Sequence, residues 1–479
     1  MGQGVLSSGE QAPRRTPAHF PGGAFVREGG VLQVAGGAGV ETVSLEALAE
    51  AFGTPLYVYS ADAMARRVRD YQAAFGSAEG GAGGEGADAS GEGGAGGAAG
   101  AGGAGGGSPG VDFLLAYSVK ANGNLAVLNR IAALGAGADI VSGGELARAL
   151  AAGIPAERIV FAGVGKTEAE MRAALEAGIH AFHVESAGEL ERLDAVAGAM
   201  GVRAPVGIRV NPDIHTDTPH EYTRTGHAAT KFGIALAQAR ELYRWAAGRD
   251  TLELRGIDVH IGSQIVEVEP YQRALDTVLA MVDELAAEGI PLSYVDLGGG
   301  FGVGYDGSRG LTPDQLAQVV VPALRDRGLR LLLEPGRSIV GEAGVLLTRV
   351  LYVKEAGGKT FAITDAGMTE LLRPSHYDGW HHIEAVRARR DAPVAPVEVV
   401  GPVCESGDFL ARDRSMPVPE PGELLAVATS GAYGFAMASN YNARPRPAEV
   451  LVEAGRAHLV RRRETVEDLF RGETIPPHP

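Results

Sequence analysis

The chain has 479 residues, of which 45% are hydrophobic and 21% are charged, so it can bury a large core and should form more than one domain. The formal net charge of −16 argues against nucleic acid or an anionic membrane as the main partner, because both would repel the protein. Cys404 is the single cysteine, which excludes an intrachain disulfide and predicts a cytoplasmic location.

The N-terminal 110 residues contain segments that differ in composition and in predicted secondary structure. Residues 1–21 contain no apolar run of signal-peptide length, and we expect a disordered tail there. Residues 22–59 combine short β-like runs with a helix over residues 44–52 that Gly53 ends, and an amphipathic helix is predicted over residues 61–75. Residues 76–110 are almost entirely Gly and Ala with scattered acids, too poor in apolar side chains to offset the entropy of ordering, so we predict a flexible insertion.

A regular alternation of strand-like and helical patterns then runs from Phe113 to Val345. The strand-like runs end at Lys120, Val141, Ala162, Val184, Val210, Ile261, Leu297 and Glu334. Eight alternations over this length favour a (β/α)8 barrel over an open doubly wound sheet, so the fold class is α/β and residues 60–345 form the barrel. Two of its helices should open with capping boxes, formed by Ser142 with Glu145 and by Ser186 with Glu189.

Beyond Thr348 the helical pattern gives way to β-rich sequence punctuated by Pro and Gly, for example at residues 361–365, 397–400 and 423–427. We predict that residues 346–479 form an all-β domain of sandwich-like or barrel-like architecture. The β-like segment 22–59 should join it, which makes this domain discontinuous in sequence.

The ends of the predicted barrel strands carry residues suited to one kind of chemistry, because the active site of such a barrel lies at the carboxyl ends of its strands. Lys120 closes the first strand, where poor solvation would favour a neutral amine able to form a Schiff base with an aldehyde. Residues 298–302, Gly-Gly-Gly-Phe-Gly, offer backbone amides to a phosphate, and Ser263 adds a hydroxyl. His260 could stack on a flat heterocycle, and Glu334 could keep a ring nitrogen protonated.

Each of these signals also has an ordinary structural explanation. A lysine at a strand end is usually solvated, a glycine run is often only a tight turn, and a barrel histidine is often only hydrogen-bonded. Glu334 could simply form an ion pair with Arg337. All four features at one barrel mouth, however, describe a site for pyridoxal 5′-phosphate.

The motifs together resemble the fold-type III pyridoxal-phosphate decarboxylases, and the resemblance covers residues 53–452. In chain order they are Tyr-Ser-Val-Lys-Ala-Asn at 117–122, His-Ile-Gly-Ser-Gln at 260–264, the glycine run at 298–302, Glu-Pro-Gly-Arg at 334–337, Arg-Pro-Ser-His-Tyr at 373–377, Cys-Glu-Ser-Gly-Asp at 404–408, Gly-Ala-Tyr at 431–433 and Met-Ala-Ser-Asn-Tyr-Asn at 437–442. The Gly/Ala insertion and the long N-terminal tail depart from the family pattern, but neither removes a motif.

The resemblance implies a role for each motif residue. Lys120 would bond covalently to the cofactor, His260 would stack on its ring and Glu334 would pair with its pyridine nitrogen. Five residues would hold the phosphate: Ser263, Gly299, Gly300, Gly336 and Tyr433. Arg337, Arg373 and Tyr377 would bind the substrate carboxylate. Arg337 would also contact the cofactor, and Tyr433 would also contact the substrate.

The resemblance also implies a homodimer, in which the partner subunit supplies Cys404 and Glu405 to the active site. The Cys404 thiol would return a proton to the α-carbon after carbon dioxide leaves, and Glu405 would bind the distal amino group of the substrate.

Substrate choice follows from the arginines, which grip carboxylates in a bidentate fork. Ornithine has no distal carboxylate, whereas diaminopimelate has one, and the Glu-Ser-Gly-Asp sequence after Cys404 is typical of family members that act on diaminopimelate. We therefore expect decarboxylation of meso-2,6-diaminopimelate to L-lysine, the last step of lysine biosynthesis. The alternatives are a related decarboxylase acting on ornithine, arginine or carboxynorspermidine, and an inactive homologue with a binding role.

We expect no metal site. His376, His381 and His382 lie close together in the sequence, but no acid or cysteine completes a ligand set at the usual spacing. The strand ends also lack an apparent His-x-His motif or carboxylate cluster, which argues against a metal-dependent hydrolase.

Overall fold

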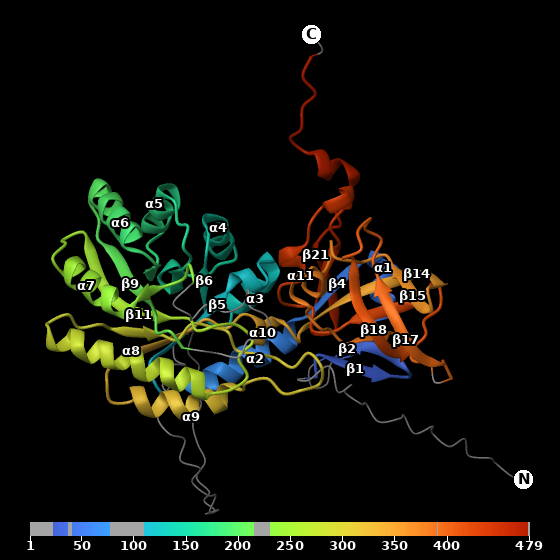
Figure 1. The fold of residues 1–479 in the computed structure, drawn as a ribbon, viewed down its shortest axis with the longest axis horizontal. Helices are drawn as coiled ribbons and strands as arrows, with labels where there is room; N and C mark the ends of the chain where they lie inside the picture. Colours follow the sequence, from blue (N-terminus) through green and yellow to red (C-terminus); the bar gives the residue numbers. More distant parts are fainter. Residues whose placement is uncertain (1–22, 37–40, 77–109, 215–229, 390, 478–479) are drawn as a thin grey trace, which may run out of the picture.

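The computed structural model describes residues 23–36, 41–76, 110–214, 230–389 and 391–477. A barrel ringed by helices lies beside a β-rich body in this part of the chain (Figure 1). The tail expected at residues 1–21 lies outside the described residues, as does nearly all of the insertion expected at 76–110. No described helix is both long enough and apolar enough to cross a membrane.

Eight parallel strands close into a barrel in the order β9, β11, β12, β13, β5, β6, β7 and β8, with β8 pairing back to β9. The (β/α)8 prediction is therefore confirmed. The strands are β5 (Phe113–Ser118), β6 (Gly137–Ile140), β7 (Ile159–Phe161), β8 (Ala181–Val184), β9 (Ala204–Asn211), β11 (Leu252–Val259), β12 (Tyr294–Asp296) and β13 (Arg330–Leu333). The short strand β10 (Ile234–Ala235) pairs with β9 outside the closed circuit.

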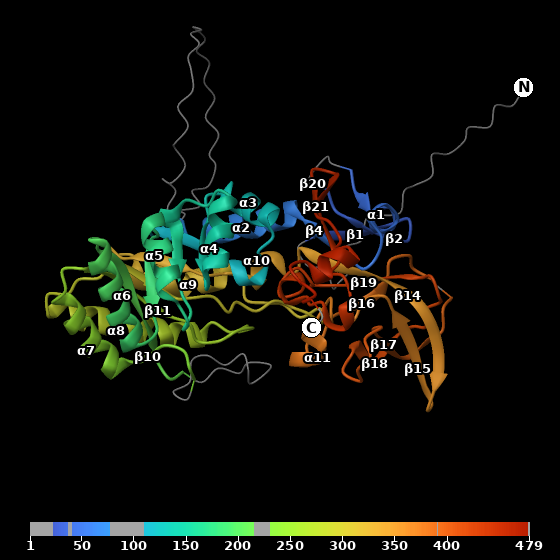
Figure 2. The ribbon, with the colours of Figure 1, turned by 90° about the horizontal axis from the view of Figure 1, so that it is seen from above.

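Helices surround these strands in both views (Figures 1 and 2). They are α2 (Ala61–Phe75), α3 (Leu125–Ala132), α4 (Gly143–Ala151), α5 (Glu168–Ala177), α6 (Ala187–Met200), α7 (Leu236–Ala247), α8 (Glu269–Ala287), α9 (Pro313–Leu324) and α10 (Arg337–Val340). Each long helix buries an apolar stripe against the barrel; α8, for example, buries Leu275, Val278 and Leu285.

The predicted capping boxes of α4 and α6 are only half formed. The hydroxyl of Ser142 accepts a hydrogen bond from the Glu145 N–H, but the Glu145 carboxylate accepts from the N–H of Val141, one residue before the cap. Ser186 and Glu189 repeat this arrangement. The cause is the extended backbone of the two serines, with φ of −159° and −158°, whereas the complete boxes at Thr167 and Thr312 have φ of −85° and −90°.

The interior of the barrel is layered. Side chains of alternate strand residues form a small apolar layer that consists of Leu114, Ala116, Val160, Ala181, Tyr294 and Leu332. Two residues further along each strand the side chain points inward again, because the strand period is two. At those positions the chain carries Ser118, His183, Asp296 and Glu334, so a buried polar layer lies between the apolar layer and the barrel mouth.

The β-rich body is built around a sheet with strand order β18, β17, β15, β14, β4, β20 and β21; β19 also pairs with β14, and β16 pairs with β19. Its strands are β4 (Leu56–Ser60), β14 (Gly344–Ala356), β15 (Lys359–Thr364), β16 (Ile383–Ala385), β17 (Val394–Val400), β18 (Phe409–Pro417), β19 (Leu424–Val427), β20 (Ala448–Glu453) and β21 (Arg456–Arg461). β4, from before the barrel, pairs with β14 and β20. A short helix, α11 (Arg373–Tyr377), interrupts the β-rich sequence.

The remaining N-terminal strands form a separate three-stranded sheet of β1 (Phe25–Glu28), β2 (Val31–Val34) and β3 (Val43–Ser44), followed by α1 (Leu45–Phe52). Gly53 ends α1 as expected, and Ser44, which was expected inside the helix, is its N-cap. The N–H of Leu32 donates to the carbonyl of Val386, which ties this sheet to the C-terminal body.

Candidate active site

A cavity of about 820 Å³ opens at the carboxyl ends of the barrel strands, within the size range of small-molecule sites. Both bodies contribute to its lining. Ten of the residues expected at the site line it: Lys120, His260, Ser263, Gly300, Glu334, Gly336, Arg337, Arg373, Tyr377 and Tyr433. Gly299 is not among the lining residues, although it lies next to Gly300.

Lys120 lies in a single turn of 3₁₀ helix (Val119–Ala121) directly after β5. Its Nζ atom is 2.6 Å from Oδ2 of Asp139, a fully buried carboxylate at the end of the neighbouring strand β6, and the Ser118 hydroxyl donates to the same oxygen at 2.8 Å. Burial by itself would lower the pKa of Lys120, but Asp139 and Glu334 raise it above its ordinary value. The expectation of a neutral amine was therefore wrong for the cofactor-free protein, because that argument considered desolvation without an acid on the next strand.

His260 follows β11 and faces the cavity. The N–H of Gly299 donates to its Nδ1 at 3.1 Å, which leaves a proton on Nε2 in the neutral ring. Burial lowers the pKa of His260 well below its usual range, and the positive charges of Arg209 and Lys120 act in the same direction. His260 is therefore a neutral, flat aromatic surface at neutral pH.

The glycines after β12 and β13 are required by close backbone approaches. Gly298 and Gly300 have φ of 67° and 88°, in the left-handed region that glycine favours. A Cβ atom at Gly299 would clash with the carbonyl oxygen of Glu334, and one at Gly300 would clash with that of Gly262. A Cβ atom at Gly336 would lie 2.9 Å from the Cβ atoms of Ser118 and Ala121. The loops therefore bring backbone without side chains to the cavity at Gly300 and Gly336, the kind of lining that can bind phosphate.

Two guanidinium groups, of Arg337 and Arg373, also line the cavity. Arg337 donates to the Tyr305 hydroxyl at 2.5 Å and to the Ser263 hydroxyl at 3.1 Å, and it lies over the Tyr433 ring at 4.7 Å. Arg373 lies 4.3 Å above the Tyr305 ring, and its Nη1 is 2.6 Å from Nε2 of His381. No Asp or Glu in the described part of the chain forms an ion pair with either arginine, so both cations are available to an anionic ligand.

Tyr305 was not predicted as a site residue. It lies three residues after the glycine run, where Arg337 donates to its hydroxyl and Arg373 lies over its ring, and nothing in its sequence context distinguishes it. Burial raises the pKa of Tyr305, but Arg337 and Arg373 lower it overall. The tyrosine therefore aligns the two cations and partly offsets their repulsion.

Cys404 and Glu405 are not brought to this cavity within one chain. Both are exposed, and neither lines the cavity. The Cys404 N–H donates to Oδ1 of Asn442 at 2.9 Å, which fixes the loop that follows β17.

A group of buried polar residues under the cavity was also missed. His183, Asp258, Asp296 and Glu334 meet inside the barrel, with one side-chain atom of each lying within 4.8 Å of the others. The expectation that the strand ends hold no carboxylate cluster was therefore wrong. A sequence signal did exist for His183 and Asp296, which are the single ionisable side chains besides tyrosine in the short strands β8 and β12, whereas β11 carries Glu253 and Arg255 besides Asp258.

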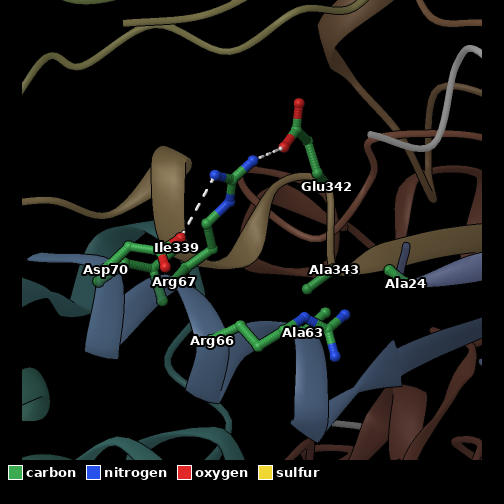
Figure 3. A pocket seen from close by; sticks show the side chains of 8 residues that line it. All are labelled: Ala24, Ala63, Arg66, Arg67, Asp70, Ile339, Glu342 and Ala343. Atoms are coloured by element: carbon green, nitrogen blue, oxygen red, sulfur yellow. Dashed lines mark hydrogen bonds and ion pairs between the residues drawn. The ribbon is translucent and has the colours of Figure 1, made fainter. Parts of the chain in front are cut away.

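A second, smaller cavity of about 170 Å³ lies between α2 and α10 (Figure 3). Its main polar feature is Arg67, which contacts Glu342 at 2.6 Å and Asp70 at 3.7 Å. None of the barrel-mouth residues lines this cavity, and its arginine is already paired. We assign it no chemistry.

Comparisons with known proteins agree with this site. A family model for the pyridoxal-binding domain of pyridoxal-dependent decarboxylases matches residues 109–341. Diaminopimelate decarboxylase of Pseudomonas aeruginosa is 48% identical over 437 residues, covering 91% of this chain and 97% of that protein.

Solved structures give the same relationship. Diaminopimelate decarboxylase from Helicobacter pylori, complexed with L-lysine, has a TM-score of 0.79 and 38% identity, covering 89% of this chain and 98% of that chain. The enzyme from M. jannaschii, also in complex with L-lysine, has a TM-score of 0.83 and 34% identity, covering 95% and 99%. The chain therefore belongs to the diaminopimelate decarboxylase family of pyridoxal-dependent decarboxylases.

Proposed function

We propose that the cavity at the barrel mouth is the site at which this enzyme decarboxylates meso-2,6-diaminopimelate to L-lysine and carbon dioxide. One observation carries the proposal: the Lys120 amine and two guanidinium groups without carboxylate partners, Arg337 and Arg373, line the same cavity. An amine that bonds the cofactor and two cations that grip a carboxylate are the groups this reaction needs.

The residues present fit pyridoxal phosphate. Backbone at Gly300 and Gly336 and the hydroxyl of Ser263 line the cavity and could bind its phosphate, with Gly299 and Tyr433 beside them. Glu334 lines the same cavity, and among the described residues its carboxylate has an ion-pair contact only with His183, so it is available to the pyridine nitrogen. When bound, the cofactor withdraws electrons from the α-carbon as carbon dioxide leaves.

The chain's own groups orient the reactants. Lys120 would bond the cofactor, and Asp139, which accepts a hydrogen bond from its Nζ at 2.6 Å, would position the amine. The neutral ring of His260 would contact the flat face of the cofactor. Arg337, Arg373 and Tyr377 hold the distal carboxylate of the substrate, which separates diaminopimelate from ornithine because ornithine leaves both cations unpaired.

Two groups must come from elsewhere to complete this site. We infer a homodimer in which Cys404 and Glu405 of one subunit reach the cavity of the other. The thiol then returns a proton to the α-carbon, and the carboxylate binds the distal amino group. The exposure of both side chains in the single chain supports this arrangement. The single, unpaired cysteine and the biosynthetic reaction support a cytoplasmic location.

A substrate panel tests the proposal. Purified holoenzyme is given diaminopimelate, ornithine, arginine or carboxynorspermidine while carbon dioxide release and the visible absorbance of bound cofactor are recorded. We expect turnover of diaminopimelate alone. Turnover of ornithine without diaminopimelate would refute the substrate assignment, and a protein without visible absorbance would point to an inactive homologue.

A further inference from the structure

The buried group formed by His183, Asp258, Asp296 and Glu334 has a geometry that centres on the histidine. Nδ1 of His183 lies 3.6 Å from Oδ2 of Asp258, 3.9 Å from Oδ2 of Asp296 and 3.7 Å from Oε1 of Glu334. Nε2 of the same ring is 3.0 Å from the Tyr294 hydroxyl. All four side chains are at most 3% exposed, so water does not screen their charges.

The charges around this group do not balance without extra protons. Arg209, on β9, is the nearest permanent cation, 3.8 Å from Asp258, but it is shared with Glu185 at 3.1 Å. Lys120 is paired with Asp139 on β6. Three carboxyl groups therefore face one imidazole and a shared guanidinium, and carboxylates this close in a buried site cannot all be ionised.

The protons distribute unequally. Burial raises the pKa of Asp296 well above its ordinary value, with Glu334 and Asp258 adding to the rise, and burial raises the pKa of Asp258 to about 7. Burial by itself would lower the pKa of His183, but Asp258, Glu334 and Asp139 raise it overall. At neutral pH we therefore expect a positively charged imidazole and a neutral Asp296.

We propose that His183 is a positioning residue that acts through Glu334. Its ring is anchored by Tyr294 and places Nδ1 3.7 Å from Oε1 of Glu334, so it attracts and orients that carboxylate, which can then hold a protonated pyridine nitrogen in the cavity above. Without a positive ring, nothing would offset the repulsion between the Asp258 and Glu334 carboxylates, and Glu334 would lose its orientation toward the cavity. This inference rests on the role of Glu334 given in the proposed function.

The first test needs no variant. Protein labelled with ¹⁵N-histidine, with and without cofactor, reports the charge of each ring through its ¹⁵N chemical shifts. We expect one histidine, identified by its loss in His183→Asn, to remain an imidazolium at pH 7.5, above the ordinary pKa of about 6.5. A neutral His183 ring at that pH would overturn the proposal.

The second test measures cofactor affinity. His183→Asn and His183→Gln keep a polar side chain but carry no charge, and we expect each to weaken cofactor binding by at least about tenfold, consistent with loss of one buried charge interaction. The expected kinetic signature is a lower kcat with little change in KM, because Arg337 and Arg373 are untouched. Unchanged affinity and kcat in a folded variant would overturn the proposal.

A matched control and a rescue separate electrostatics from packing. His180, three residues earlier, also contacts the Tyr294 ring, with the ring centres 5.4 Å apart, so His180→Asn should leave cofactor affinity and kcat unchanged. The double variant His183→Asn/Asp258→Asn also lacks the acid next to Glu334, and it should recover most of the cofactor affinity lost in His183→Asn. If His183→Asn lost affinity through a packing defect, the second substitution would not restore it. Failure of this rescue would also overturn the proposal.

Two further outcomes are distinguishable. Full cofactor affinity and activity in Glu334→Ala would refute the role of Glu334 in the proposed function, whereas a Glu334 effect without a His183 effect refutes only this inference. Stoichiometric zinc or manganese in purified holoenzyme, lost together with Asp296→Asn, would mean that a cation holds the group together and would overturn the imidazolium assignment.

Discussion

At the scale of single residues, the contact between Lys120 and Asp139 decides when the amine can react. The ammonium of Lys120 is stabilised by a buried carboxylate at 2.6 Å, so it must lose a proton before it can bond the cofactor. The acid that would accept this proton lies on the adjacent strand, and the sequence around Lys120 does not contain it.

We expect Asp139→Asn to change the pH dependence of cofactor uptake. With the carboxylate removed, burial dominates and the pKa of Lys120 falls, so the rise in uptake rate should move to lower pH by about 1–3 units. Stopped-flow measurement of visible absorbance after mixing apoprotein with cofactor checks this shift. Asp70→Asn, on α2 away from the cavity, is a control that should leave the profile unchanged. An unshifted profile in Asp139→Asn would contradict the prediction.

Asp258 supplies a second pH effect, on stability. Its pKa rises from 3.8 to about 7 on folding, so its protonated form favours the folded state. The protonated carboxyl of Asp258 therefore adds up to a few kcal/mol to the free energy of unfolding below about pH 4. This contribution is lost as the pH rises through about 7. Urea unfolding of the apoprotein between pH 5 and 8, compared with Asp258→Asn, should give a flatter profile in the variant. Parallel profiles would contradict the assignment.

At the scale of elements, β4 is the strand that joins the two bodies. It precedes α2 and the barrel in the sequence, yet it pairs with β14 on one side and with β20 on the other. All five of its residues are buried. Substitutions that shorten a buried side chain of β4 should therefore destabilise both the C-terminal sheet and the first elements of the barrel.

We predict that Val58→Ala, at a fully buried position of β4, lowers the free energy of unfolding by about 1–3 kcal/mol through the cavity it leaves. Val394→Ala removes the same atoms from a position of β17 that is 65% exposed, and it should change the free energy by less than about 0.5 kcal/mol. Denaturant unfolding followed by circular dichroism compares the two variants. Equal effects would mean that β4 is not a central strand in solution.

The sequence predicted elements better than it predicted their contacts. The bounds of α2, residues 61–75, and the end of α1 at Gly53 were foreseen, because hydrophobic spacing and helix-ending residues act locally. The capping boxes of α4 and α6 formed only halfway, because the extended backbone at Ser142 and Ser186 comes from the preceding barrel strand. The sequence could not show which strands pair with β4. Its partners β14 and β20 are separated from it by the whole barrel in the sequence, so no local pattern links them.

At the scale of the whole molecule, the cavity draws on both bodies, and by our proposal on two subunits. Lys120, His260 and Glu334 come from the barrel, while Arg373, Tyr377 and Tyr433 come from the C-terminal region. Exposure of Cys404 and Glu405 outside the cavity leaves the single chain without the proton donor that the reaction needs.

Subunit mixing tests this shared site. Lys120→Ala and Cys404→Ala should each lose most turnover, and Cys404→Ala should retain the visible absorbance of bound cofactor that Lys120→Ala lacks. If each site combines Lys120 of one subunit with Cys404 of the other, refolding the two variants together in equal amounts restores about 25% of wild-type activity, because half of the dimers carry one intact site. Activity no higher than that of the separate variants, with exchange verified by mass spectrometry, would contradict a shared site.

The sequence by itself determined the barrel and the residue types at its mouth. Strand and helix periodicity are local properties, and the carboxyl ends of parallel strands must meet at one face, so Lys120, His260 and Glu334 could be assigned to one site without coordinates. Only the tertiary structure decided the electrostatics of that site. The ion pair of Lys120 with Asp139, Tyr305 between two arginines, and His183 among three carboxyl groups join different strands and loops. Because charge interactions depend on distance and burial rather than on sequence spacing, these contacts follow only from the closed barrel.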